Sequence, residues 1–265
     1  MDLSENAEFF FGSKNSPQDR GVIILFFHIT MTTPAKRKVE SQPKLKLYYF
    51  NIRGKGEPIR LFCASAGLEL EDCRFACRED FGALKEAGKL SFGQVPLLEI
   101  DEGKHQLVQT NAIMRYLSVL AGLDPSDDPI AAAKIDAALD QQTDAFTGIT
   151  AVTYSTRFGL PLQGDDIRKE AYQMINQDVL PRHLGNLEKM LQASSTGWIA
   201  NTGEPSMADF VWWCALHHSL RSNTYLDASI QELKEYPSLQ AFCQKFANLD
   251  AIREYYEKEK AAASS

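Results

Sequence analysis

The chain has 265 residues, of which 44% are hydrophobic and 24% are charged. This composition is typical of a globular protein with one large core or two smaller ones. The formal net charge of −7 gives no general support to a nucleic-acid partner, because phosphate binding needs a basic surface. No apolar run reaches the roughly 18 residues that a membrane-spanning helix needs. We therefore expect a cytoplasmic protein with neither nucleic acid nor a membrane as its partner.

The five cysteines are odd in number and include no Cys-x-x-Cys pair. This pattern predicts neither a zinc site nor a disulfide framework. We expect free thiols and no metal site.

Residues 1–43 differ from the rest of the chain. Their apolar run "GVIILFFHIT" is too short to span a membrane, and it lacks the basic start and small-residue cleavage site of a secretory signal. A polar, proline-containing stretch follows, in which Met31 could start a shorter product. We expect residues 1–43 to be a disordered N-terminal extension, with a weak targeting segment as the alternative.

Residues 44–122 alternate between strand and helix patterns. Leu45, Leu47 and Tyr49 share one face of the first strand, opposite Lys46 and Tyr48. A helix should follow from 57 to 67, then a strand over 68–76, a helix over 79–88, a hairpin of 95–100 with 105–109, and a helix over 110–122. This order predicts an α/β domain with the thioredoxin-like arrangement.

After the linker "GLDPSDDP" the strand signals stop. Helical spacing alone is found in 130–158, 165–193, 206–222 and 237–257. Ser206-x-x-Asp209 is a capping box that should start the third of these segments. We therefore expect an all-helical domain over 129–258.

Three motifs, "LYYFNIRGKGEPIRL", "FGQVPLLEI" and "QTNAIMRYL", carry a family resemblance. Together with the domain order, they make residues 45–258 resemble a cytosolic glutathione transferase, most closely the sigma class that includes the haematopoietic prostaglandin D synthases. The resemblance implies a homodimeric enzyme that activates the glutathione thiol for conjugation to hydrophobic electrophiles, or for reduction or isomerisation of peroxides. Glutathione would be a co-substrate, with no permanently bound cofactor.

Tyr49 is the candidate catalytic residue. A thiol with a pKa of about 8.5 is only about 3% thiolate at pH 7, and a phenol that donates a hydrogen bond to the sulfur favours the charged form. The resembled family places its tyrosine directly before a phenylalanine, here Phe50, which selects Tyr49 over Tyr48. The inward face of the strand also carries Tyr49, so a plain core tyrosine is the alternative interpretation.

The resemblance assigns glutathione binding to a larger set: Phe50, Lys55, Phe81, Lys85, Gln94, Val95, Pro96, Gln109, Thr110 and Asp144. In the family the Val95-Pro96 bond is cis and leaves the Val95 backbone free to pair with an extended peptide, as an added strand would; an ordinary loop proline is the alternative. Lys55 stands where some sigma-class members have arginine, so prostaglandin isomerase activity does not follow from the resemblance.

Thr110 is expected to be the N-cap of its helix, beside the first backbone amides and the positive end of the helix dipole. Such a helix start suits a carboxylate, and in the resembled family it holds the γ-glutamyl carboxylate. A plain helix cap is compatible with this role.

Asp136, Asp140 and Asp144 lie four residues apart, on one stripe of the first helix of the second domain. A solvated face is the usual explanation. In the resembled dimers an aspartate at the Asp144 position reaches the γ-glutamyl ammonium in the neighbouring subunit. Thr143 stands where some relatives have a second aspartate, which weakens the case for a divalent cation between subunits.

The acceptor site should use the loop after Tyr49 and the helix near Ile149, Val152 and Phe158. Two other functions fit the same fold: a non-catalytic, crystallin-like structural protein, and a thiol oxidoreductase that uses a cysteine. The presence of Tyr49 argues against both. His217 and His218 are expected to be core and surface residues rather than metal ligands.

Overall fold

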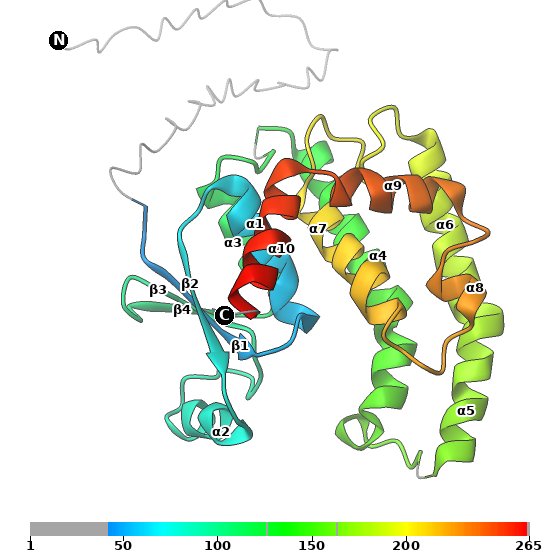
Figure 1. Ribbon diagram of the computed structural model, residues 1–265, viewed down its shortest axis with the longest axis horizontal. Coiled ribbons are helices and arrows are strands. Elements are labelled where there is room, and N and C mark those ends of the chain that lie inside the picture. The colour runs from blue at the N-terminus through cyan, green and yellow to red at the C-terminus, as the bar shows by residue number, and fades with distance from the viewer. Residues whose placement is uncertain (1–41, 126, 163, 264–265) are drawn as a thin grey trace, which may run out of the picture. The chain divides into compact units, whose positions relative to one another are not determined.

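The computed structural model describes residues 42–125, 127–162 and 164–263, shown in colour in Figure 1. These described residues form one compact unit. The expected extension, with its apolar run and Met31, lies outside the described residues except for its last two positions.

The N-terminal part contains a four-stranded mixed sheet and three helices. Its elements are β1 (Leu45–Phe50), the 3-10 turn η1 (Gly54–Gly56), α1 (Glu57–Ala66), β2 (Leu70–Phe75), α2 (Arg78–Glu86), β3 (Leu97–Ile100), β4 (His105–Val108) and α3 (Thr110–Leu120). The strand order is β2-β1-β3-β4, with β1 parallel to β2 and antiparallel to β3. The predicted thioredoxin-like arrangement is confirmed.

Strand β1 follows the predicted alternation. Leu45, Leu47 and Tyr49 are buried, while the residues between them are partly exposed. Tyr48 donates a hydrogen bond to the carboxylate of Glu99 at 3.1 Å on the more open face. The two neighbouring tyrosines therefore have different surroundings, and only Tyr49 lies on the side of the core.

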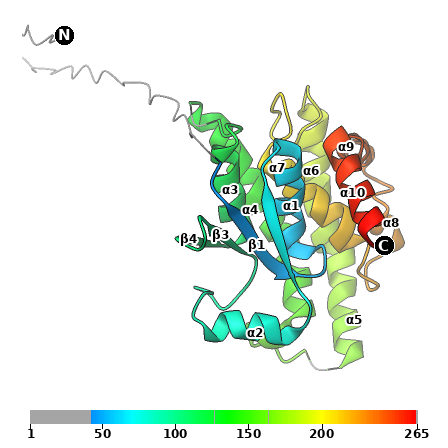
Figure 2. The same ribbon diagram turned by 60° about the vertical axis from the view of Figure 1, so that its left-hand side comes forward.

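Helix α1 begins with Glu57-Pro58, where proline at the start of a helix loses no hydrogen bond. It ends at Gly67, whose φ of 66° is favourable for glycine. It packs against α3 in its own domain and against α7 and α10 of the helical domain. Figure 1 shows α10 beside α1, and Figure 2 shows α7 beside α1. One continuous hydrophobic core therefore extends across both parts, with Phe62 edge-on to Phe210 at 5.2 Å between ring centroids.

The C-terminal part is helical, as predicted. Its elements are α4 (Pro129–Thr153), η2 (Ser155–Phe158), α5 (Asp165–Met174), η3 (Ile175–Val179), α6 (Leu180–Ala193), α7 (Met207–Cys214), η4 (Ala215–Leu220), α8 (Ala228–Gln231), α9 (Pro237–Ala247) and α10 (Asp250–Ala263). The elements η3 and η4 are π-helical turns that continue α5 and α7. The domain boundaries at 44–122 and 129–258 stay predictions.

Two details differ from the predicted helices. The segment 237–257 is not one helix, because α9 ends at Ala247 and α10 begins at Asp250. Asn248, with poor helix propensity, caps α9. The short helix α8 lies outside the predicted helical segments, because its four residues are too few to show a helical period. Among the described residues, none of the helices combines the length and apolar character of a membrane span.

The capping box at the start of α7 is confirmed. Asp209 is fully buried and accepts hydrogen bonds from the backbone amides of Ser206 and Ile199, each at 2.8 Å. It therefore joins the preceding loop to α7, and its role is structural.

Candidate active site

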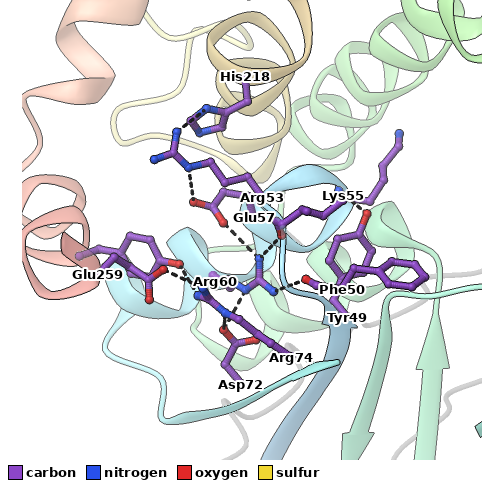
Figure 3. A network of polar contacts seen from close by, with 12 residues as sticks. Tyr49, Phe50, Arg53, Lys55, Glu57, Arg60, Asp72, Arg74, His218 and Glu259 are labelled. Carbon is purple, nitrogen blue, oxygen red and sulfur yellow. Dashed lines mark hydrogen bonds and ion pairs between the residues drawn. The ribbon is translucent and has the colours of Figure 1, made fainter. Parts of the chain in front are cut away.

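Tyr49 lies at the end of β1, with its hydroxyl directed at the turn that follows (Figure 3). The residue is 7% exposed, and its Oη accepts a hydrogen bond from the backbone N–H of Lys55 at 2.9 Å. A phenol has one proton to donate in addition to its accepting lone pairs. Since Lys55 supplies the accepted bond, the proton of Tyr49 remains available for another acceptor.

Two glycines allow the turn to wrap around this ring. A Cβ on Gly54, whose φ is +41°, would lie 2.7 Å from the hydroxyl oxygen of Tyr49. A Cβ on Gly56 would lie 2.7 Å from Cδ1 of the same ring. Such contacts are too close for any side chain, so glycine at both positions is what lets the Lys55 amide reach the phenol.

Burial raises the pKa of Tyr49, and this effect outweighs the hydrogen bond from the Lys55 amide, which lowers it. Tyr154 also raises the pKa, and the Arg60 guanidinium, 5.8 Å from the ring centroid, lowers it. The phenol therefore keeps its proton at neutral pH. It is suited to donate a hydrogen bond and not to act as a base.

Thr110 joins this turn from a distant part of the sequence. Its Oγ1 donates to the backbone carbonyl of Lys55 at 3.0 Å. The peptide groups of Lys55 thus connect Tyr49 and Thr110.

The expectation that Thr110 is the N-cap of α3 is wrong. Gln109 is the N-cap, with a φ of 75°, and Thr110 is the first helical residue. Its hydroxyl bonds to Lys55 instead of capping its own helix, because Gln109 makes the sharp turn from β4 into α3.

Phe50 and Phe81 belong to one aromatic cluster. The rings of Phe50 and Phe81 lie 5.4 Å apart, and Phe75 lies 5.4 Å from Phe50. Phe81 therefore supports the strand end that carries Tyr49. Lys85, one turn further along α2, is exposed.

The Val95-Pro96 bond is cis, as expected. Pro96 is buried, whereas Gln94 and Val95 are partly exposed in the segment that leads into β3. Their part in binding stays a prediction.

The aspartate stripe of α4 faces outward, as expected for a solvated face. Asp140 and Asp144 are exposed, whereas Asp136 pairs with Arg115 of α3 at 2.7 Å. Within the described chain, Asp144 has no contact with Tyr49, so its predicted role depends on a second subunit.

Two residues expected to line the acceptor site are core residues instead. Ile149 and Val152 are 8% and 6% exposed and belong to the common hydrophobic core. Exposed apolar or aromatic side chains in the loop after Tyr49 and just after α4 include Ile52, Tyr154 and Phe158. The helical period correctly identified the apolar face of α4, but this face packs into the core instead of lining the acceptor site.

A buried ion network behind Tyr49 was missed by the sequence analysis. Glu57 and Arg60, 2% and 3% exposed, pair on the inner side of α1 at 3.2 Å. Arg60 also donates to Asp72 at 2.9 Å (Figure 3) and to the backbone carbonyl of Ile52 at 2.9 Å. The sequence signal that could have revealed this network was a pair of opposite charges three residues apart, Glu57 and Arg60, in a largely apolar helix.

The cysteines do not resemble reactive thiols. All five have a raised pKa; burial raises that of Cys63 to about 12, and Cys73, Cys77, Cys214 and Cys243 shift in the same direction. Catalytic thiols need a lowered pKa. The described residues also contain no cluster of three or more potential metal ligands.

Two family models match the chain. The model "Glutathione S-transferase, N-terminal domain" matches residues 45–119, and "Glutathione S-transferase, C-terminal domain" matches residues 158–259. The chain is 31% identical to the human protein named glutathione S-transferase A3 over 81% of its own length and 88% of that protein. It is also 31% identical to a glutathione S-transferase of Anopheles gambiae, over 82% and 97% of the two chains.

The solved structure of prostaglandin synthase D of Nilaparvata lugens has a similar fold. It is 27% identical and superimposes with a TM-score of 0.68 over 82% of this chain and 98% of that one. Both family models match in order, and the chain is 31% identical to two of these relatives over 81% and 82% of its length. The chain therefore belongs to the glutathione transferase family and is a glutathione transferase.

Proposed function

We propose that Tyr49 activates the glutathione thiol by donating its phenolic proton in a hydrogen bond to the sulfur. The observation that carries this proposal is the 2.9 Å hydrogen bond from the Lys55 amide to the Tyr49 hydroxyl. It orients the phenol so that its own proton is free for an incoming acceptor. Each pKa unit by which the thiol is lowered corresponds to about 1.4 kcal/mol.

The tripeptide would bind along the turn η1 and the start of α3. Phe50, Phe81, Gln94, Val95, Pro96 and Gln109 would form its walls and backbone partners. Lys55 and Lys85, both exposed, would supply positive charges for its carboxylates. The first amides of α3 at Thr110 would add the favourable end of a helix dipole. Glutathione would enter and leave as a co-substrate, with no permanently bound cofactor.

The second substrate would be a hydrophobic electrophile or a peroxide. Ile52 in the loop after Tyr49, and Tyr154 and Phe158 after α4, are exposed apolar or aromatic side chains. Tyr154 influences the pKa of Tyr49, which supports an acceptor site on this side of the catalytic hydroxyl.

We further propose that the protein is a cytoplasmic homodimer. In this assembly Asp144, exposed on α4, would complete the glutathione site of the partner subunit. Its carboxylate would bind the γ-glutamyl ammonium in a charge-assisted hydrogen bond.

The thiolate absorbance of bound glutathione tests the proposed mechanism. Adding glutathione to the protein at neutral pH should produce the ultraviolet band of a thiolate, and Tyr49→Phe should lose it while binding glutathione with similar affinity. No band in the wild-type protein would instead favour a binding or structural protein. Turnover of a halo-nitrobenzene, a lipid hydroperoxide and an endoperoxide would then identify the class of electrophile.

A further inference from the structure

Arg53, the residue before the glycine turn, is held by groups from three parts of the chain. Its guanidinium donates to Nδ1 of His218 at 3.2 Å and lies 4.0 Å from the carboxylate of Glu57. It also lies over the ring of Tyr256, 5.1 Å from the centroid, at a distance that suits a cation–π contact. His218 comes from η4 and Tyr256 from α10, so both belong to the helical domain.

These four residues form a closed circuit of three hydrogen bonds and one ion pair, the 4.0 Å contact between Arg53 and Glu57. Besides the contact with Arg53, His218 contacts the Tyr256 hydroxyl through Nε2 at 3.0 Å, and Tyr256 donates to Glu57 at 2.8 Å. Glu57 is 2% exposed, so its charge needs these partners. Figure 3 shows Arg53 between Glu57 and His218.

The directions of the bonds are mutually consistent. A guanidinium can only donate, so Nδ1 of His218 must accept from Arg53. Nε2 of a neutral imidazole then carries the proton and donates to Tyr256, which in turn donates to Glu57. Burial, followed by the charge of Arg53, lowers the pKa of His218 to about 3, so this neutral tautomer is the form present at physiological pH.

The position of His218 depends on a local irregularity of its helix. It lies in the π-helical turn η4, Ala215–Leu220, which continues α7. Such turns add a residue to a helical repeat and frequently occur at functional sites. The neighbouring His217 stacks on Trp213 at 4.3 Å between ring centroids, which leaves His218 directed at Arg53.

The circuit also fixes the backbone of the thiol-activating turn. The carbonyl of Arg53 accepts from the amide of Glu57 at 3.0 Å, so both ends of the turn belong to residues of the circuit. The amide of Lys55 lies between them and donates to Tyr49. Any shift of Arg53 or Glu57 would therefore move the amide that orients the phenol.

We propose that Arg53, Glu57, His218 and Tyr256 act together as positioning residues for Tyr49, so that the helical domain sets the acidity of the glutathione thiol. This inference rests on the proposed role of Tyr49 as the residue that activates the thiol. It extends that role to residues 165 and 199 positions away from Arg53 and Glu57 in the sequence.

The test is a pH titration of the thiolate absorbance in the glutathione complex. Tyr256→Phe keeps the ring under Arg53 but removes the hydroxyl between His218 and Glu57. We expect the pKa of the bound thiol to rise by about 0.5 to 1 unit, with turnover at pH 6.5 reduced about threefold to tenfold. The deficit should vanish at high pH, where the thiol ionises unaided, and the KM for glutathione should stay within about twofold.

Tyr255→Phe is the matched control. It removes a hydroxyl from the neighbouring residue of α10, which accepts a bond from Arg74 at 3.4 Å instead of joining the circuit. It should leave the thiol pKa unchanged. His218→Leu should reproduce the effect of Tyr256→Phe, and the double variant should be no worse than either single one, because both changes break the same circuit.

The outcomes separate this inference from the proposed function. An unchanged thiol pKa in both Tyr256→Phe and His218→Leu would overturn the inference alone, while the wild-type thiolate band would still support Tyr49. A loss of turnover that is equal at every pH would also overturn it, because it would indicate general damage to the fold. An absent thiolate band in the wild-type protein would overturn both.

Discussion

Gly56 lies so close to the ring of Tyr49 that a Cβ on Gly56 would stand 2.7 Å from Cδ1 and 2.9 Å from Cγ of the tyrosine. The turn and the phenol therefore fit together only while position 56 lacks a side chain. Position 54 must also lack a side chain, because a Cβ on Gly54 would lie 2.7 Å from the hydroxyl oxygen of Tyr49.

Gly56→Ala should displace Tyr49 or the Lys55 amide. Overpacking of this kind costs about 1–3 kcal/mol, so we expect a lower melting temperature and a clear loss of turnover. Gly82→Ala is the control: this glycine lies within α2, nothing lies within 4 Å of its Cβ position, and alanine there should stabilise the protein by about 0.4–1 kcal/mol. Full activity in Gly56→Ala would show that the close fit is unimportant.

Tyr49→Phe should lower turnover by about an order of magnitude or more, since one pKa unit of thiol activation is a factor of ten. The affinity for glutathione should be nearly unchanged. Tyr48→Phe should affect neither quantity, because its hydroxyl bonds to Glu99, which Lys89 also holds at 2.9 Å. Steady-state kinetics and calorimetric binding would check both variants, and equal activity in Tyr49→Phe would remove the mechanism.

The stability of the protein should fall as the pH drops below about 6.5, the ordinary pKa of histidine. His218 has a folded-state pKa of about 3, so in this range the unfolded chain binds a proton that the folded one does not. The charged and titratable groups around the His218 ring are those of Arg53, Arg221, His217 and Tyr256. The stability that the folded protein gains by keeping His218 neutral is fully present above pH 6.5 and is lost as the pH falls toward 3.

Denaturant unfolding at several pH values would measure this effect. His218→Gln should flatten the pH dependence, by at most about 1.4 kcal/mol per pH unit and by less because the ring is partly exposed. The interpretation fails if His218→Gln keeps the wild-type slope.

Asp144→Ala should weaken glutathione binding without affecting the fold. A charge-assisted hydrogen bond contributes about 1.5–3 kcal/mol, so the dissociation constant should rise about tenfold to a hundredfold. Asp140→Ala removes the same charge one turn earlier on the same exposed stripe and should leave the affinity near that of the wild-type protein.

Mixed dimers would show which subunit Asp144 serves. If a Tyr49→Phe subunit pairs with an Asp144→Ala subunit, a shared site puts both defects in one active site and leaves the other intact. Activity should then return to about half of the wild-type value. No recovered activity would mean that Asp144 serves its own subunit.

Local patterns in the sequence predicted much of the fold. The alternation of Leu45, Leu47 and Tyr49 gave the inward face of β1, and Ser206 with Asp209 gave the start of α7. These features depend on neighbours two to four residues apart, which is the range that sequence periodicity reports.

The sequence was less informative where distant segments meet. The capping role expected for Thr110 was wrong because the φ of Gln109 and the carbonyl of Lys55, 55 residues away, determine where that hydroxyl bonds. The contact between Arg53 and His218 spans 165 residues and involves a π-helical turn. No local pattern could have revealed either.

Helix α1 packs against elements of both domains, and its side chains belong to the one continuous core. As a consequence, the protein is not modular at the level of its two domains. A chimaera that exchanged the helical domain to obtain a new acceptor specificity would also replace the surface on which α1 rests. Such an exchange should succeed only if the incoming domain brings an α7 and an α10 that match α1, and evolution of substrate range in this chain would be easier through the exposed residues after α4 than through recombination.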